Sequence, residues 1–230
     1  MSVVIIIPAR FQSSRYPGKP LVELRGAGGA ARSLIRRSWD AAMAVSGVDR
    51  VIVATDDDRI ADHAAGFGAE VAMTSTTARN GTERCAEAVA TLGLSPEIVV
   101  NLQGDEPFAP ASGIRAVAQA LAASGHPMST LATPISDANT LFDPNAVKLV
   151  RDANGDSLYF SRAPLPWQVR HGDGEDSLIW TVSPRAASRN DRVRAVSTSW
   201  PPRGRCARLR PPAPPQRARE VGSRAPSPRT

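Results

Sequence analysis

The sequence predicts an α/β protein with a mostly parallel, doubly wound sheet. Short β-branched runs, the kind found in strands buried on both faces, recur through the first half of the chain. Segments with apolar residues at helical spacing separate these runs, and polar loops follow them. Strand and helix alternating at this spacing are typical of Rossmann-like sheets. The 230 residues are enough for one such domain with a sizeable core.

The predicted elements follow in order along the first 124 residues. Strands are expected over 3–7, 51–54, 70–73 and 98–101, and helices over 31–46, 59–67, 83–92 and 112–124. The buried face of the first helix should carry Leu34, Ile35, Trp39 and Met43. Asp57 or Asp58 can cap the second helix, which Gly68 ends.

Three polar loops follow predicted strands, over residues 8–20, 55–57 and 101–107. Ligands of doubly wound sheets bind outside the carboxyl ends of the strands. The three loops should therefore line one crevice.

The pattern changes at about residue 129. Short strands are expected over 129–135, 147–151 and 157–160, separated by turns such as residues 152–155. This spacing indicates a small antiparallel excursion from the parallel sheet.

Residues 184–230 differ from the rest of the chain. They hold 12 Arg, no Lys, two acidic residues and 9 of the 20 Pro. No apolar period is visible, so a disordered tail is predicted after one folded domain over 1–183. The overall charge of +6 lies in this tail, because residues 1–183 carry 16 basic and 20 acidic side chains. A nucleic-acid-binding body is therefore not expected.

Nothing in the sequence predicts export or membrane insertion. The apolar run at residues 3–7 is too short for a signal peptide or a spanning helix, so a cytoplasmic protein is expected. Cys85 and Cys206 are the only cysteines, and two cysteines define neither a metal site nor a disulfide framework. Cys85 is expected in the core of its helix.

The loop over residues 8–20 carries the first candidate chemistry. Arg10, Arg15 and Lys19 place three cations within ten residues, as a departing pyrophosphate would require. Backbone N–H groups after a first strand can also face a phosphate. The alternative is a solvated basic loop, and spacing alone does not decide between the two.

Two further segments could complete a nucleotide site. Asp105 follows a buried strand and could hold Mg²⁺, and Gly104 could let a ligand approach closely, although an acidic turn is the simpler interpretation. The hydroxyls and glycine of residues 74–84 could bind a base or ribose. The alternative there is a turn in which Thr82 caps the helix, with Glu83 in its first turn.

Five motifs in order resemble the 3-deoxy-manno-octulosonate (Kdo) cytidylyltransferases. They are IIIPARFQSSRYPGKPL, ATDD, TSTTARNGTERCAEA, NLQGDEP and DPNAVKLVRDANGDSLYFSRAPLPW, within residues 3–167. The resemblance implies a nucleotide-diphospho-sugar transferase type of fold and transfer of CMP from CTP to Kdo, with release of pyrophosphate, for lipopolysaccharide synthesis. It also implies Mg²⁺ as cofactor and a homodimer for the intact family member.

The resemblance also assigns roles to individual residues. CTP would be held by Pro8, Ala9, Arg10 and Lys19, with the last two on its phosphates. The cytidine would lie near Ser75, Gly81, Thr82 and Glu83, although the family usually has Asp at position 83. Asp105 would bind Mg²⁺ and act in catalysis with Arg10 and Lys19. The sugar acid would meet Arg15, Gln103, Tyr159 and Arg162, because a carboxylate suits an arginine fork.

The chain departs from the family pattern after Pro166-Trp167. The late strand, Leu-Glu-rich helix and second metal-binding Asp of the family are not found there. A frameshifted or truncated member is expected, because many Arg and no Lys after residue 183 are what a GC-rich coding strand gives when it is read in the wrong frame. A natural basic tail is the alternative. The chain could then be an active enzyme, or a nucleotide-binding member with impaired catalysis. A sialic-acid-type cytidylyltransferase is disfavoured, because Ser13-Ser14-Arg15 and Lys19-Pro20-Leu21 replace its first motif.

Overall fold

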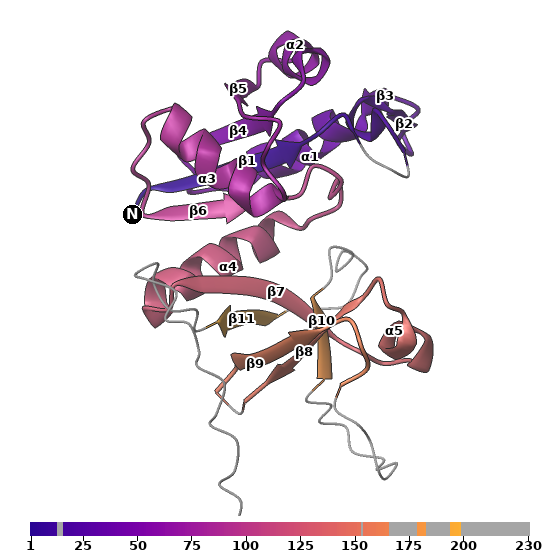
Figure 1. The fold of residues 1–230 in the computed structure, drawn as a ribbon, viewed down its shortest axis with the longest axis vertical. Coiled ribbons are helices and arrows are strands. Elements are labelled where there is room, and N and C mark those ends of the chain that lie inside the picture. Colours follow the sequence, from indigo (N-terminus) through magenta and orange to yellow (C-terminus); the bar gives the residue numbers. More distant parts are fainter. Residues whose placement is uncertain (13–15, 153, 166–178, 183–193, 199–230) are drawn as a thin grey trace, which may run out of the picture. The chain divides into compact units, whose positions relative to one another are not determined.

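The parallel sheet is the centre of the computed structural model, which describes residues 1–12, 16–152, 154–165 and the backbone of 179–182 and 194–198. These residues all belong to the unit Met1–Trp200, the first of two in the chain. The sheet has the order β5-β4-β1-β6 and contains β1 Val3–Ala9, β4 Arg50–Thr55, β5 Glu70–Met73 and β6 Ile98–Asn101 (Figure 1). Its pairings are parallel, so the predicted fold class is confirmed.

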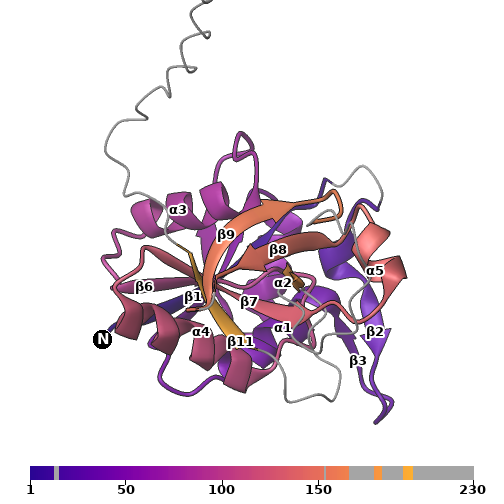
Figure 2. The ribbon, with the colours of Figure 1, turned by 90° about the horizontal axis from the view of Figure 1, so that it is seen from below.

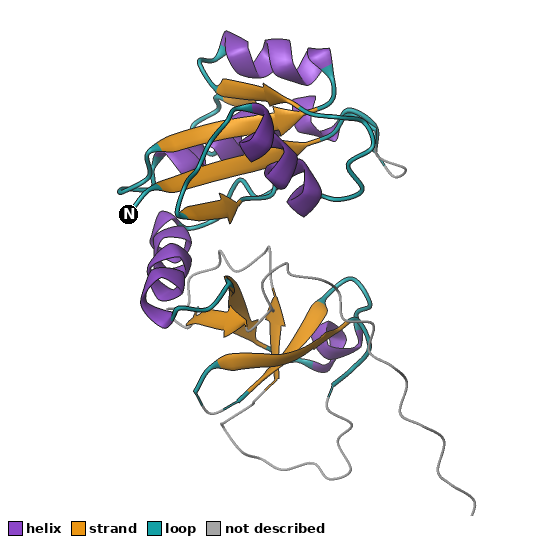
Figure 3. Ribbon diagram, turned by 60° about the vertical axis from the view of Figure 1, so that its left-hand side comes forward, coloured by secondary structure: helices purple, strands orange, loops and turns teal. Residues whose placement is uncertain are grey.

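Helices cover both faces of this sheet (Figure 3). They are α1 Leu34–Met43, α2 Asp58–Gly66, α3 Gly81–Thr91 and α4 Ala111–Ser124. In β1, Ile5 and Ile7 pack in one core cluster with residues of α1, α2 and α4. Val4 and Ile6 point to the opposite face and pack with residues of α3. Because alternate side chains meet different helices, a strand buried on both faces is an unbroken apolar run.

Cys85 belongs to the core of α3, as predicted. Its side chain is almost fully buried beside Ile6 and Ala88. Burial raises the pKa of the Cys85 thiol to about 12, which outweighs the opposing effect of the Arg84 charge. The thiol therefore remains protonated at neutral pH and is a packing group, not a nucleophile.

The first helix is shorter than the sequence predicted. Residues Ala31–Ser33 form β3, which pairs with β2 Glu23–Arg25 in a small antiparallel sheet. Ser33 ends this hairpin and caps α1, because its Oγ accepts from the Arg36 N–H at 3.3 Å. Met43 was expected on the buried face but is 55% exposed, since the buried stripe ends at Ala42.

The N-terminal cap of α2 was predicted correctly, whereas that of α3 is a different residue from the one considered. Asp57, one of the two expected residues, caps α2, and Gly68 follows this helix at φ +86°. Thr82 does not cap α3. Asn80 does so instead, accepting from the Glu83 N–H at 2.9 Å, and the helix begins at Gly81. Asn is at least as good a cap as Thr, and here it lies two residues earlier.

The later strands form a second sheet with mostly antiparallel pairings, as predicted. It is a closed barrel in the order β10-β7-β11-β9-β8. Figure 1 labels all five strands, and Figure 2 labels β7, β8, β9 and β11 from below. The strands of this barrel are β7 Met128–Pro134, β8 Val147–Arg151, β9 Asp156–Ser161, β10 Ile179–Val182 and β11 Arg194–Thr198; α5 Ala138–Phe142 was not predicted. Only the β11–β9 pairing is parallel among these described strands.

Strand β11 lies inside the segment that was expected to contain no regular structure. Within that segment, residues 194–198 pair antiparallel with β7 along their whole length. Strand pairing uses backbone groups and needs no apolar period, which is why the sequence pattern did not reveal it. The division at residue 183 stays a prediction, because most of 184–230 lies outside the described residues.

Among the helices of the described ranges, none has the length and apolar character needed to cross a bilayer.

Candidate functional site

A pocket of about 360 Å³ opens beside the carboxyl ends of β1 and β6. Seven predicted site residues line it: Pro8, Ala9, Arg10, Lys19, Gly81, Gln103 and Asp105. Topology brings them together, since the carboxyl ends of parallel strands lie at one edge of a sheet. The loops over 8–20 and 101–107 therefore share a crevice as predicted, whereas residues 55–57 are not among those lining the pocket.

Positive charge dominates the lining of this pocket. Asp105 is its one acidic residue in the described part of the chain, against Arg10, Lys19, Arg79 and Arg84. Lys19 Nζ lies 2.5 Å from Asp105 Oδ2, and both side chains are 48% exposed. Arg10 has no ion-pair partner among the described residues. A pocket with such a surplus of cations is suited to a polyanionic ligand.

Gly104 allows two parts of the pocket wall to pack together. A Cβ at this position would lie 2.9 Å from the Pro8 carbonyl oxygen and 3.3 Å from Ile35 Cδ1. The Gly104 carbonyl also accepts from Ser38 Oγ at 2.9 Å. The sequence predicted that this glycine leaves space for a ligand, but the space next to its Cα is occupied by β1 and α1.

Gly104→Ala should lower the free energy of unfolding by about 1–3 kcal/mol, because a backbone carbonyl in a buried strand cannot move aside cheaply. Gly66→Ala is the matched control, since a Cβ there would meet nothing within 4 Å. That variant should be unchanged or up to about 1 kcal/mol more stable. Urea unfolding of both variants measures the difference, and equal stabilities would contradict the close approach at Gly104.

Arg84 is a pocket residue that was not among the predicted site residues. It is only 3% exposed, and its Nη2 donates to Asp56 Oδ2 at 2.9 Å. Its Nη1 donates to Thr74 Oγ1, so one guanidinium joins α3 to the segments that follow β4 and β5. The sequence could have indicated that Arg84 is buried, because it lies beside Cys85 and one helical turn before Ala88, both of which were predicted on the buried face. Gly104, which was expected near the ligand, lines the pocket, and the other lining residues without a predicted role are Pro20, Leu34, Ala78, Arg79 and Asn80.

Three residues predicted near the cytidine do not line the pocket. The Ser75 N–H donates to Glu87 Oε1 at 2.6 Å. Thr82 Oγ1 accepts from Asn101 Nδ2 at 3.4 Å. Glu83 accepts from the backbone N–H and the Nε of Arg79. All three lie within six residues of the lining residue Gly81 in the sequence, but their side chains are not part of the pocket lining.

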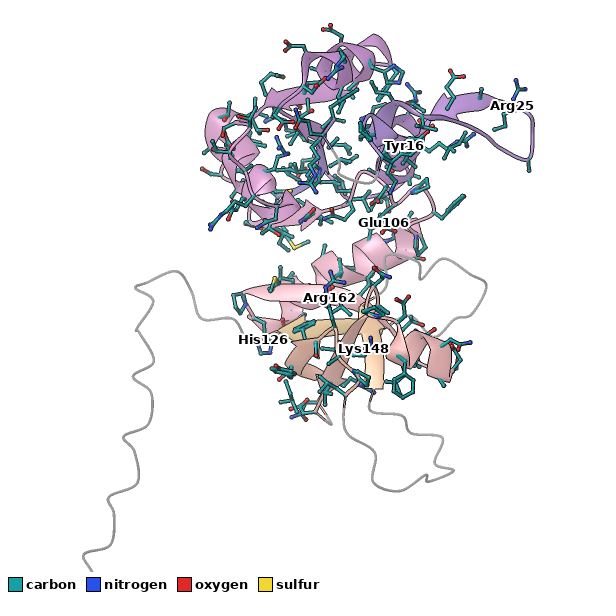
Figure 4. All side chains as sticks on the ribbon, turned by 45° about the vertical axis from the view of Figure 1, so that its right-hand side comes forward. Tyr16, Arg25, Glu106, His126, Lys148 and Arg162 are labelled. Carbon is teal, nitrogen blue, oxygen red and sulfur yellow. The ribbon has the colours of Figure 1, made fainter. Side chains whose placement is uncertain are left out.

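The predicted sugar-acid residues are divided among three locations. Gln103 lines the pocket and donates to Asn101 Oδ1 at 2.9 Å, whereas Arg15 lies outside the described residues. Tyr159 is 61% exposed on β9. Arg162, labelled in Figure 4, donates from Nη1 to the carbonyls of Pro144 and Asn145 at 3.0 and 3.3 Å. Neither Tyr159 nor Arg162 lines the pocket.

Comparison with known proteins agrees with this fold. A family model described as cytidylyltransferase matches residues 4–177. The chain is 53% identical over 173 residues to the 3-deoxy-manno-octulosonate cytidylyltransferase of Stenotrophomonas maltophilia K279a, covering 74% of this chain and 64% of the relative. It is 55% identical over 166 residues to the protein of that name from Xanthomonas campestris pv. campestris B100, covering 71% and 57%.

A solved structure is also similar. It is a CMP:2-keto-3-deoxy-manno-octonic acid synthetase complexed with CTP, with 31% identity, a TM-score of 0.70, and coverage of 86% of this chain and 74% of that one. The fold is thus that of a nucleotidyltransferase. Within that class, the chain belongs to the cytidylyltransferase family, as its motifs predicted. It spans 57–64% of the length of the two curated relatives.

Proposed function

We propose that this protein binds CTP in the pocket and transfers CMP to the anomeric hydroxyl of Kdo, releasing pyrophosphate. The observation that supports this most directly is the pocket with surplus cations at the carboxyl ends of β1 and β6. Two relatives more than 50% identical to the chain carry the name of this activity. The similar solved structure was determined with CTP.

Arg10 and Lys19 would hold the triphosphate. In the reaction, the anomeric oxygen of Kdo forms a bond to the α-phosphorus, and the bond from that phosphorus to the bridging oxygen breaks. The hydroxyl proton is released, and pyrophosphate leaves with the electron pair of the broken bond. Negative charge therefore grows on the departing group, where fixed cations stabilise it best.

Asp105 fits the role of a Mg²⁺ ligand. Its carboxylate lines the pocket and is half exposed, and Mg²⁺ prefers hard oxygen donors. No group of three or more potential metal-binding side chains occurs in the described part of the chain. One carboxylate completed by phosphates and waters is a common way to hold this ion. When bound, Mg²⁺ would neutralise phosphate charge.

The remaining predicted contacts are part of the same proposal. Pro8, Ala9 and Gly81 would lie against the nucleotide, and Ser75, Thr82 and Glu83 near its cytidine. The sugar acid would be recognised by Arg15, Gln103, Tyr159 and Arg162. A supply of activated Kdo for lipopolysaccharide and a homodimer are implied by the family resemblance, and a cytoplasmic location stays the expectation drawn from the lack of a targeting segment.

A second candidate is a chain that binds CTP but transfers CMP poorly. It is favoured by one observation: the family match ends at residue 177, although the chain continues to residue 230. The described pocket residues all lie between Pro8 and Asp105, inside the matched region, whereas part of the acceptor site is expected from residues after Trp167. Misplacing reacting groups by about 1 Å can cost on the order of 100-fold in rate.

Two measurements separate these candidates. Calorimetry with CTP, UTP, ATP and GTP should give the tightest binding for CTP. Pyrophosphate release with CTP, Kdo and Mg²⁺ is then compared with that of the Stenotrophomonas relative. Release at a similar rate supports the full activity, and CTP binding with far slower release supports the second candidate. Equal affinities for all four nucleotides would contradict both.

A further inference from the structure

Phe11 belongs to the pocket loop but does not line the pocket. Its ring packs against the core cluster between the sheet and helices α1 and α2. Its carbonyl oxygen accepts from the Gly18 N–H at 2.8 Å, which joins the start of the loop to its end. Phe11 therefore connects the core of the sheet domain to the backbone just before Lys19.

Arg59 lies on the outer face of the Phe11 ring. Its Cζ is 3.3 Å from the ring centroid, which is direct stacking of the guanidinium on the aromatic face. Asp57 fixes the plane of this guanidinium, because Nε and Nη2 donate to its two carboxylate oxygens at 2.9 and 2.6 Å. Asp57 is itself held in place as the cap of α2.

Gly18 lies against the Phe11 ring on the way to Lys19. A Cβ on Gly18 would be 3.1 Å from two carbons of this ring, and its φ of +71° is one that glycine adopts without strain. The next residue, Lys19, begins the short 3-10 helix η1, Lys19–Leu21. Its Nζ reaches Asp105 at 2.5 Å. An unbroken series of contacts thus runs from Asp57 through Arg59, Phe11 and Gly18 to the pocket.

We propose that Phe11 and Arg59 are positioning residues, which hold the Gly18 turn so that Lys19 is presented to the phosphates of the bound nucleotide. This rests on the proposed function, in which Lys19 contacts those phosphates. Arg59 does not line the pocket and its side chain is 61% exposed, so its effect on a nucleotide passes through the Phe11 ring. Asp57 of the ATDD motif thereby gains a role, beside Asp56 of the same motif, which pairs with the lining residue Arg84.

The test measures the binding of CTP, inorganic triphosphate and cytidine by calorimetry. Arg59→Gln removes the stacked cation and Phe11→Leu removes the flat ring, and each is made alone and together with Lys19→Met. Arg59→Lys keeps the charge but loses the fork to Asp57. Arg36→Gln is the matched control, since Arg36 also stacks on two rings, Trp39 and Phe67, but does not line the pocket.

Arg59→Gln and Phe11→Leu should each weaken CTP and inorganic triphosphate about two- to fivefold, with Arg59→Lys intermediate. Cytidine binding should not change, because cytidine carries no phosphate. In the Lys19→Met background the same substitutions should have no further effect, because their path to the ligand has been removed. Arg36→Gln should bind all three ligands as the unchanged protein does.

Three results would overturn the proposal: unchanged CTP affinity in both variants, an equal loss for cytidine, or an undiminished loss in the Lys19→Met background. Equal weakening by Arg36→Gln would also overturn it, because general destabilisation would then explain the effect. Failure of the proposed function has a different signature, since the unchanged protein would then fail to bind CTP at all.

Discussion

Lys19→Met is expected to weaken CTP binding by about ten- to hundredfold. A hydrogen bond to a charged group contributes about 1.5–3 kcal/mol when its partner would otherwise be left without one. Lys19 Nζ already lies in the pocket, where Asp105 is its ion-pair partner, so the amine is near the place where a phosphate would bind. Methionine is one atom shorter than lysine and lacks the charged amine. Calorimetry measures the loss, and a change below twofold would show that Lys19 does not contact the nucleotide.

Asp105→Asn is the informative partner of this variant, because its effect should depend on metal. Without Mg²⁺, CTP should bind as tightly as before or more tightly, since Lys19 loses the carboxylate that competes with phosphate for it. With Mg²⁺, the gain in affinity seen with the unchanged protein should be lost. A Mg²⁺ titration of CTP binding separates the two conditions. An unchanged metal dependence would exclude Asp105 as a ligand.

Lys148→Met should be the most destabilising of the substitutions considered, by about 3–5 kcal/mol. Lys148 is fully buried in the barrel, where Figure 4 labels it close to Arg162. Its Nζ donates to the carbonyls of Asp143, Ala146 and Arg162 at 2.5, 3.0 and 2.8 Å. Methionine fills similar space but removes all three of these hydrogen bonds, and among the described residues only the Asp143 carbonyl keeps another donor, the Ala146 N–H at 3.1 Å. Urea unfolding measures the loss.

Arg162→Gln is the control for that experiment. It also removes a cation that donates to carbonyls of the same turn, at Pro144 and Asn145, but from an exposed position. Water can replace an exposed donor, so the expected loss is under about 1 kcal/mol. Similar losses for the two variants would show that burial of the Lys148 amine is not the source of its effect.

The parallel sheet could be predicted because its signals are local. The strands over 70–73 and 98–101 have the bounds predicted for them, since each is a short apolar run between turn residues. The pocket followed from one general rule, that loops after parallel strands converge. Lys19 and Asp105 are 86 residues apart, and neither spacing nor composition pairs them. Knowing the sheet order is enough to place them together.

The contacts that were missed depend on tertiary structure. Arg84 is an ordinary helix former in the sequence, and only the fold shows that its charge is buried against Asp56. Arg79 could not be matched with Glu83, because a turn residue and a first-turn residue pair only once the Asn80 cap is known. Strand β11 is held by backbone pairing to β7, and its five residues lie in an arginine- and proline-rich segment whose pattern did not indicate a strand.

Within the described part of the chain, the residues that line the pocket come from the first 105 positions, whereas Tyr159 and Arg162 belong to strands and turns of the barrel. In evolutionary terms, the proposed nucleotide contacts and one part of the proposed acceptor contacts, Tyr159 and Arg162, are then encoded by successive stretches of the gene, whereas Arg15 and Gln103 belong to the first stretch. Substitutions after residue 128 can change which sugar acid is accepted while the nucleotide contacts remain under separate selection. A lineage could therefore change its acceptor while the residues that bind CTP stay the same.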